Sequence, residues 1–522
     1  MGNKQVSEGK EVDQRLAALI TNANAVQAVA AAVEGTIGPK GLDTMLVDRF
    51  GAVTITNDGV TILEEMEATH PAARMVINTA RAQENEVGDG TTTATILAAS
   101  LVSEGLSRVM KGVPVARLLD GIQLGLERAL DFLRKRARPV RGCDDPILYQ
   151  VAHVAGRGRR DIAELIVQAA AMVGEEKLRD PAFKLRDSIV AVEGAANQVF
   201  EGVLVRRSRL HKMMPTELHD VRVLIVDDAL APEELGEGSL ATEAGFNKYL
   251  SLQEEFYRNL IKIIDLGVRL VVVDRGVDDR AEEILAEAGV MVLKRVSTKE
   301  WRRVAEHTGA WPIKRTGLKK GPEELLRCLG RARRVWEDER LEHVRVEGGE
   351  GKPYATILVG AATAEVLQER ERIARDAASA VQAALRGGVV PGGGTVELAV
   401  ARDLEPVRSE ARGMAAYGVE CVMAALERPF MQIVTNAGFN ALEKLGEAVA
   451  AQRETGKDSI GVDCDTGAVC DLWEKGIVDP MLVKFNALQA AGELAQAILR
   501  IDTIVRRKEG EKGPDSARRD EF

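Results

Sequence analysis

Val87-Gly88-Asp89-Gly90-Thr91-Thr92-Thr93-Ala94-Thr95 places one carboxylate between two glycines, followed by three threonines and an apolar run from Ile96 to Val109. Glycine permits a left-handed backbone and a close approach to a ligand. Threonine favours helix starts, where the first backbone N–H groups have no partner inside the helix and the helix dipole attracts anions. The stretch therefore predicts a phosphate-binding loop at the start of a helix. An Asp-Gly turn with a threonine helix cap is the simpler alternative.

The carboxylate of Asp89 would stand at the mouth of this loop. Mg²⁺ takes oxygen ligands, and in nucleotide sites it is commonly held by one or two carboxylates together with the phosphates. Asp89 is therefore a candidate ligand of a phosphate-bound Mg²⁺.

The composition describes a soluble globular protein. The chain has 522 residues, 45% of them hydrophobic and 29% charged, which is enough for about two to four domains. Alanine, valine and glycine are abundant, which suggests closely packed helices. A net charge of −10 and an aromatic content of 4% argue against nucleic-acid binding. No apolar run approaches the length needed to span a bilayer, and residues 1–14 are polar, so we expect a cytoplasmic protein without a membrane segment.

The cysteines and histidines show no pattern typical of a metal site or a disulfide framework. The five cysteines are scattered and include no CxxC pair. Cys464 and Cys470 lie close in sequence, but no histidine is near them, so buried thiols are expected rather than metal ligands. The six histidines lack ligand spacing, and none is assigned a catalytic role.

Further loops and turns carry possible site residues. Thr36-Ile37-Gly38-Pro39-Lys40-Gly41 follows an amphipathic helix over 16–33, and a third glycine-rich loop spans Gly387 to Gly394. Asn57-Asp58-Gly59 is a tight turn after two short predicted strands, 45–47 and 53–56, and it would hold Asp58 out from the strand end; turn chemistry alone explains such a triplet equally well. The segment 156–160 (Gly-Arg-Gly-Arg-Arg) interrupts a helical pattern over 147–173, either as a solvated loop or as a sensor of a terminal phosphate.

The middle of the chain has a different periodicity. Between about 207 and 349, short buried-strand runs over 221–226, 268–273 and 290–296 alternate with amphipathic helices over 281–288 and 299–307, which predicts an α/β layer. No glycine-rich loop follows these strands, so a dinucleotide-binding fold is excluded there. The segment 235–256 carries Phe246, Tyr249 and Leu250 among charged residues, either as an ordinary surface helix or as a partner-binding surface.

The outer parts of the chain are mainly helical. Helices are predicted over 61–67, 72–86 and 114–138, and a long helix over 365–385 contains Asp376 beside small residues. The tail from about 508 to 522 is charged and is expected to be disordered. Because glycine-rich loops of the phosphate type lie near both ends of the chain, the simplest architecture is one helical nucleotide domain formed by both termini, interrupted by the α/β insertion.

The motifs together resemble the chaperonins. The resemblance rests on residues 36–41, 54–62, 88–95, 387–394 and Leu499-Arg500-Ile501-Asp502, which occur in the family's order over nearly the whole chain. His70-Pro71-Ala72-Ala73 and the long insertion after Asp228 are similar to the group II type, which includes the thermosome. Other features, such as Phe50-Gly51-Ala52, look nearer to the bacterial group I type. The chain is identified as similar to a divergent group II-like chaperonin, of the bacterial type called group III.

This resemblance implies a multidomain α and α/β fold with three domains. A mainly helical equatorial ATPase domain would comprise 1–141 and 387–522, and a small intermediate domain would comprise 142–206 and 354–386. An α/β apical domain, 207–353, would bind client proteins and carry a helical protrusion at about 235–256 that acts as a built-in lid.

The resemblance also implies a role for each matching residue. Asp89 would hold Mg²⁺, and Asp58 and Asp376 fall where the family has two water-positioning aspartates. Arg157 stands where group II members have a lysine that senses the terminal phosphate, although this loop departs from the family in detail. Phe246, Tyr249 and Leu250 would contact clients or neighbouring protrusions. The remaining residues would bind nucleotide: Thr36, Gly38, Pro39, Gly90, Thr91, Thr92, Thr93, Gly393 and Asp479.

The implied function is ATP-dependent protein folding. The cofactors would be ATP and Mg²⁺, and the partners would be non-native client proteins and further copies of the chain, in two stacked rings of about eight subunits each. No separate co-chaperonin is expected. Because Asp58 belongs to the nucleotide domain and Asp376 to the inserted part, such a site would be complete only after hinge closure. Two other classes stay open on the residues alone, namely an ATP-dependent small-molecule phosphotransferase and a scaffold that binds ATP without hydrolysis.

Overall fold

A computed structural model describes residues 8–51, 53–233 and 242–504, and it divides the chain into two compact units. The first unit joins the two ends of the chain, Met1–Ala137 and Val390–Phe522, and the second is the continuous stretch Arg138–Val389. The tail over 508–522 and the first residues of the predicted protrusion, 235–241, lie outside the described residues. The two-unit division does not separate an intermediate from an apical domain, so the three-domain boundaries stay predictions.

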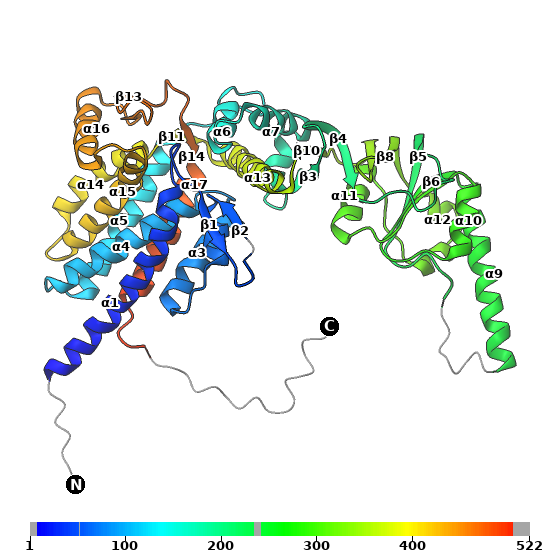
Figure 1. Ribbon diagram of the computed structural model, residues 1–522, viewed down its shortest axis with the longest axis horizontal. Helices are drawn as coiled ribbons and strands as arrows, with labels where there is room; N and C mark the ends of the chain where they lie inside the picture. Colours follow the sequence, from blue (N-terminus) through cyan, green and yellow to red (C-terminus); the bar gives the residue numbers. More distant parts are fainter. Residues whose placement is uncertain (1–7, 52, 234–241, 505–522) are drawn as a thin grey trace, which may run out of the picture. The chain divides into compact units, whose positions relative to one another are not determined.

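The first unit is mainly helical (Figure 1). Its elements are α1 (Glu8–Val33), η1 (Glu34–Thr36), β1 (Thr44–Val47), β2 (Val53–Thr56), α2 (Gly59–Glu65), α3 (Pro71–Glu86), α4 (Thr91–Met110), α5 (Val115–Arg136), β11 (Val389–Pro391), α14 (Thr395–Glu410), α15 (Ala415–Asn436), α16 (Ala441–Thr455), β12 (Ile460–Val462), β13 (Val469–Asp471), β14 (Val478–Pro480) and α17 (Met481–Leu499). The strands form three two-stranded pairs, β1–β2, β11–β14 and β12–β13. The helices and the β1–β2 pair predicted for this part of the sequence are confirmed.

One hydrophobic core joins the two ends of the chain in this unit. It takes buried side chains from α1, α3, α4 and α5 near the beginning and from α14, α15 and α17 near the end. In Figure 1 the gold α15 and the red α17 accordingly lie among the blue and cyan helices. The crossing of α5 and α15 depends on glycine, because a Cβ on Gly121 would lie 1.9 Å from the carbonyl oxygen of Ala415. Alanine and glycine therefore allow these helices to approach closely.

The second unit contains a helical part and a sheet. Its elements are α6 (Ile147–Ala155), α7 (Arg160–Val173), α8 (Glu175–Arg179), η2 (Leu185–Ser188), β3 (Ile189–Glu193), β4 (Gln198–Val205), β5 (Glu217–Val226), α9 (Glu243–Asp265), β6 (Val268–Val273), α10 (Asp279–Glu287), β7 (Met291–Leu293), α11 (Thr298–Thr308), η3 (Arg315–Lys319), α12 (Pro322–Leu326), β8 (Gly330–Asp338), β9 (His343–Gly349), β10 (Ala355–Ala361) and α13 (Ala364–Gly387).

The sheet of this unit has eight strands in the order β3-β10-β4-β9-β8-β5-β6-β7. β5, β6 and β7 pair in parallel, as do β10 and β3, and the remaining neighbours are antiparallel. Alternate residues of a strand point to opposite faces. In β5, Val223 and Ile225 therefore enter one core, whereas Leu224 and Val226 enter the other. Burial on both faces explains the continuous apolar runs from which these strands were predicted.

The charged strands β8 and β9 are not predicted from the sequence. β8 reads Gly-Arg-Ala-Arg-Arg-Val-Trp-Glu-Asp, and β9 begins at a histidine and contains Arg345 and Glu347. Their charged residues hide the buried side chains, which include Ala332 and Val335 of β8 and Val344 and Val346 of β9. These strands make the layer a mixed sheet, because they add antiparallel pairs beside the parallel ones.

One sequence-based prediction about apolar runs needs correction. Residues 16–36, mostly α1, are long and apolar enough to span a bilayer by length and composition alone, although no run of that length was expected. Within α1, however, Leu19, Ala23, Val26, Ala30 and Val33 are buried in the core of the first unit. A core helix of a soluble protein passes the same test, so this helix does not indicate a membrane protein.

Candidate functional site

The loop before α4 has the backbone geometry expected of a phosphate-binding turn. Gly90 is the residue that caps α4, and its φ of 80° lies in the left-handed region. No side chain caps the helix, so the alternative of a threonine cap is wrong. The N–H of Gly90 donates to Oδ1 of Asp89 at 2.6 Å, which fixes the carboxylate beside the helix start. The first turn, Thr91–Thr93, therefore presents backbone N–H groups that the helix itself does not use.

A buried glutamine stabilises this loop through hydrogen bonds. Nε2 of Gln83, on α3, donates to the carbonyl oxygens of Asp89 (2.9 Å) and Val483 (3.2 Å). A Cβ on Gly90 would lie 2.6 Å from Cγ1 of Val483, so the loop is packed against the first turn of α17. Gln83 is not among the predicted site residues, although one signal for it exists in the sequence. Gln83 continues the buried face formed by Val76 and Ala80, at a position where an apolar residue is expected.

The turn that carries Asp58 packs directly on the start of α4. Asp58 caps α2, and its Oδ2 accepts hydrogen bonds from the backbone N–H (3.1 Å) and the hydroxyl (2.6 Å) of Thr61. A Cβ on Gly59 would lie only 2.3 Å from Oγ1 of Thr92. The turn chemistry expected for this triplet is thus present, and the same turn lies beside the threonine loop.

The loop over 36–41 is held by α15. Nδ2 of Asn436 donates to the carbonyl oxygens of Glu34 and Ile37, both at 2.9 Å. Gly38 has a φ of 89°, and a Cβ there would lie 3.1 Å from the side chain of Ile433. The two ends of the chain therefore build this turn together, with Thr36, Gly38 and Pro39 on the N-terminal side.

The third glycine-rich loop lies against Asp479. The N–H of Gly392 donates to the carbonyl oxygen of Ile477 at 3.0 Å, and a Cβ on Gly392 would lie 3.2 Å from Cγ of Asp479. Gly393 and Gly394 both have positive φ, and Gly394 caps α14. Asp479 also forms an ion pair with Lys484 at 2.9 Å. Gly393 and Asp479, which are far apart in the sequence, thus belong to one local structure.

Arg157 and Asp376 both lie in the second unit. Arg157 follows the end of α6 and Asp376 lies on α13, and these two segments are neighbours. Arg157 has a φ of 54°, which is uncommon for a residue with a side chain. Its guanidinium forms an ion pair with Glu369 of α13 at 3.4 Å. A Cβ on the adjacent Gly156 would lie 3.8 Å from that of Ala377, the residue after Asp376. Asp376 itself is half-buried on α13.

The candidate client residues lie on α9, also in the second unit. The side chains of Phe246 and Leu250 are 51% and 44% exposed. Tyr249 is half-buried, and its hydroxyl accepts a hydrogen bond from Gln253. Farther along the helix, Leu252 and Phe256 are buried in the unit's core. The helix thus changes from an exposed apolar start to a packed continuation.

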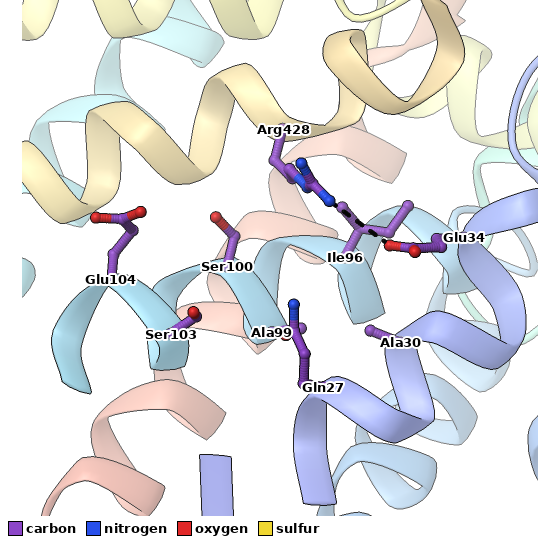
Figure 2. A pocket seen from close by; sticks show the side chains of 9 residues that line it. All are labelled: Gln27, Ala30, Glu34, Ile96, Ala99, Ser100, Ser103, Glu104 and Arg428. Carbon is purple, nitrogen blue, oxygen red and sulfur yellow. Dashed lines mark ion pairs between the residues drawn. The ribbon is translucent and has the colours of Figure 1, made fainter. Parts of the chain in front are cut away.

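A cavity of about 220 Å³ lies in the first unit between α1, α4 and α15 (Figure 2). Arg428 reaches across it towards Glu34, with 3.8 Å between the charged groups. The first residue of α4 that lines the cavity is Ile96, which follows Thr91–Thr93 in the sequence. None of the lining residues is a predicted site residue. We assign it no part in the candidate site. It is lined by Gln27, Ala30, Glu34, Ile96, Ala99, Ser100, Ser103, Glu104 and Arg428.

The donor set suits a nucleotide-bound Mg²⁺ better than a metal held by protein alone. Over residues 8–51, 53–233 and 242–504, no three His, Cys, Asp or Glu side chains come close enough to hold an ion. Mg²⁺ in nucleotide sites needs only one or two carboxylates, because phosphates and water supply the other ligands. Asp89, fixed at the helix start by the Gly90 N–H, fits that requirement.

Comparisons with known proteins agree over nearly the whole chain. Residues 29–509 match the TCP-1/cpn60 chaperonin family. The chain is 35% identical to the thermosome subunit beta of Archaeoglobus fulgidus, over 94% of this chain and 93% of that protein. It is 32% identical to the thermosome subunit of Pyrococcus abyssi, over 94% and 92% of the two chains. Among solved structures, a group III chaperonin crystallised in the open state is 48% identical and superposes with a TM-score of 0.88, over 95% of this chain and all of that one.

Proposed function

The chain belongs to the TCP-1/cpn60 chaperonin family, and from that premise we propose that the Gly90 loop, the Asp58 turn and the loops over 36–41 and 392–394 bind Mg-ATP. The protein is an ATP-dependent chaperonin and an ATPase, and its subunits form a ring-shaped oligomer that binds non-native proteins. The phosphotransferase and scaffold alternatives are not favoured.

The packing of Gly59 on Thr92 is the observation that carries the assignment. It puts a carboxylate-bearing turn beside a helix start whose Gly90 has the left-handed backbone of an anion-binding turn. Gly90 and Thr91–Thr93 would bind the phosphates through backbone N–H groups and hydroxyls. Thr36, Gly38 and Pro39 would contact the nucleotide through their backbone. Gly393 and Asp479 would meet the ribose and adenine side, with Asp479 accepting a hydrogen bond from a ribose hydroxyl.

Asp89 would hold Mg²⁺, which when bound neutralises charge on the phosphates of ATP. Asp58 and Asp376 would position the attacking water, since a carboxylate can accept a hydrogen bond from it and orient it. Arg157 would pair with the terminal phosphate, because a guanidinium suits phosphate geometry. In the described structure its partner is Glu369 instead.

The strand pair β1–β2 supports the proposal that copies of this chain assemble through it. Met45 lies opposite Ile55, and Val47 lies opposite Val53, so the four side chains share one face of the pair. All four are between 54% and 62% exposed, and Phe50 at the turn is 81% exposed. An apolar face of this kind on a soluble protein marks a contact surface. We propose that a neighbouring subunit covers it in each of two stacked rings of about eight subunits.

Phe246, Tyr249 and Leu250 at the start of α9 would contact clients or the neighbouring protrusions, and the protrusion would close the cavity without a separate co-chaperonin. We place the protein in the cytoplasm. The identity of 48% with a group III chaperonin, against 35% and 32% with the two thermosome subunits, supports a group III assignment within the family.

The assignment of Asp89 is tested by its replacement with alanine. We expect Asp89→Ala to lose Mg²⁺-dependent ATP hydrolysis by at least about a hundredfold, because one bound cation neutralises much of the phosphate charge. Turnover is measured over a Mg²⁺ titration, with Asp120→Ala, an exposed aspartate on α5, as the matched control. An unchanged rate and Mg²⁺ dependence in Asp89→Ala would refute the metal role.

A further inference from the structure

A buried ion cluster lies behind the third glycine-rich loop. Nζ of Lys484, on the first turns of α17, lies 2.8 Å from Oε1 of Glu397 and 2.9 Å from Oδ2 of Asp479. The side chains of Lys484 and Glu397 are only 10% and 3% exposed, whereas that of Asp479 is 22% exposed. The ammonium of Lys484 thus bridges the buried carboxylate of Glu397 and the partly exposed carboxylate of Asp479.

The electrostatics of the cluster favour a charged Lys484. Burial alone would lower the pKa of this ammonium, but the carboxylates of Asp479 and Glu397 raise the pKa above its ordinary value. Glu397 occupies the first turn of α14, where the helix dipole also favours a negative charge. Buried charges persist only when they are paired in this way. The position of Asp479 is therefore tied to two largely buried side chains, Lys484 and Glu397.

The segment from Asp479 to Lys484 touches two of the proposed nucleotide loops. Asp479 lies against Gly392, as the 3.2 Å separation from a Cβ there indicates. Val483, which precedes Lys484, accepts a hydrogen bond from Gln83 and packs against Gly90. Lys484 can therefore hold Asp479 at a fixed position relative to the loop that precedes α4.

We propose that Lys484 and Glu397 are positioning residues that orient the Asp479 carboxylate towards a ribose hydroxyl of the bound nucleotide. The ammonium of Lys484 pairs with Oδ2 of Asp479. This contact fixes the orientation of the carboxylate, so that the carboxylate can accept a hydrogen bond from the sugar. The inference rests on the proposed function, which gives Asp479 its place at the ribose. Neither Lys484 nor Glu397 touches the nucleotide in this scheme.

Selectivity for the sugar separates this role from a merely structural one. Loss of a buried ion cluster can lower stability, but only misplacement of Asp479 removes discrimination between ATP and its 2′-deoxy and 3′-deoxy forms. A hydrogen bond to a charged group contributes about tenfold or more to binding. We therefore expect the wild-type protein to prefer ATP over one or both deoxynucleotides by about that factor in kcat/KM.

The experiment measures kcat and KM for the three nucleotides on the full-length, assembled protein. In Lys484→Met we expect KM for ATP to rise by about tenfold while KM for the deoxynucleotide changes little, so that the preference disappears. Glu397→Gln should shift the preference in the same direction by a smaller factor. Lys444→Met is the matched control, because Lys444 forms an ion pair with Glu447 within α16, outside the proposed site, and should leave the preference intact.

Asp479→Ala distinguishes the inference from the proposal on which it rests. If Asp479→Ala loses the preference and Lys484→Met keeps it, the positioning role is overturned and the ribose assignment stands. If Asp479→Ala keeps the preference, the ribose assignment itself fails, and the inference fails with it. If Lys484→Met does not assemble, the double variant Glu397→Gln/Lys484→Met provides the test, because it removes the buried carboxylate charge together with the ammonium.

Discussion

Gly59 shows how closely single residues of the candidate site are packed. Its backbone is not in the left-handed region, so space alone decides what the position tolerates. A Cβ would lie 2.3 Å from Oγ1 of Thr92 and 3.3 Å from the Thr92 backbone nitrogen. Any side chain here must displace the hydroxyl of Thr92. Glycine is thus required by the contact between the two turns.

This packing leads to a prediction for Gly59→Ala. We expect KM for ATP to rise by about tenfold and the free energy of unfolding to fall by about 1–3 kcal/mol, because an overpacked contact shifts Thr92. Steady-state ATPase assays and thermal unfolding measure the two effects. Gly446→Ala is the control, since a Cβ at Gly446 on α16 meets nothing within 4 Å. Equal KM values in the two variants would contradict the proposed role of this contact.

Asp376 allows a second prediction at the scale of the residue. We expect Asp376→Ala to bind nucleotide normally and to lose about a hundredfold in kcat, because it would no longer orient the attacking water. Binding of a fluorescent ATP analogue and single-turnover hydrolysis separate the two steps. Glu371→Ala, on the same helix α13, removes only an ion pair with Arg375 and serves as the control. Turnover of Asp376→Ala at the wild-type rate would remove Asp376 from the catalytic set.

At the scale of the element, the β1–β2 pair leaves one apolar face exposed to solvent. Its exposed face carries Met45, Val47, Val53 and Ile55, and an isolated pair of strands is only marginally stable in water. The pair therefore gains stability from whatever covers that face. A neighbouring copy of the chain fits this requirement, because rings repeat the same contact between every pair of subunits.

A charge on this face should break the assembly. We expect Ile55→Lys to shift the particle from about 0.9 MDa, which corresponds to sixteen chains of 56.5 kDa, towards single subunits, because burial of an unpaired ammonium is unfavourable. Light scattering at matched concentrations measures the mass. Leu442→Lys on α16, another exposed apolar position, tests whether any added charge has this effect. A full-size particle for Ile55→Lys would show that the face lies outside the subunit contact.

The strands β8 and β9 illustrate a limit of sequence reasoning at this scale. Arginines fill the exposed positions of β8, and their long side chains lie across its surface; Arg334, for example, stacks on Trp336. A charged alternation of this kind can belong to a helix or to a strand. Only the neighbours supplied by the folded sheet decide for the strand.

At the scale of the whole molecule, the α/β insertion leaves and re-enters the helical unit through two connections. The chain passes from Ala137 to Arg138 and returns from Val389 to Val390. Arg136, next to the first connection, pairs with Asp403 and Asp458 of the later part of the chain. The exit of the insertion is therefore fixed to residues that lie beyond its return.

The lid proposal gives a prediction at this scale. Because Leu252 and Phe256 are buried, a deletion of the protrusion should end before Leu252. We expect removal of residues 235–250 to leave ATP turnover within about twofold of the wild type, since no proposed ATP-site residue lies in that range, and to abolish protection of an enclosed client from protease. Protease challenge of a captured client, with and without ATP, measures enclosure.

A substitution on the same helix provides the control for this deletion. Ile261 is exposed on the later part of α9, so Ile261→Ser changes a surface apolar residue without shortening the protrusion. It should keep both turnover and protection. Clients that stay protected after the deletion would show that the protrusion is not the lid.

The family, the mixed helical and α/β composition, and the loops at both ends of the chain can be predicted from the sequence, because glycines, threonines and carboxylates at fixed spacings are local signals. The folded structure adds that Gly90 caps α4, that Gly59 packs on Thr92, that Gln83 donates to the carbonyl oxygens of Asp89 and Val483, and that Lys484 pairs with Asp479. Those contacts join residues up to 400 positions apart, such as Gln83 and Val483. The sequence alone does not show whether a polar side chain is solvated or buried against a distant partner, because its burial depends on how the whole chain folds.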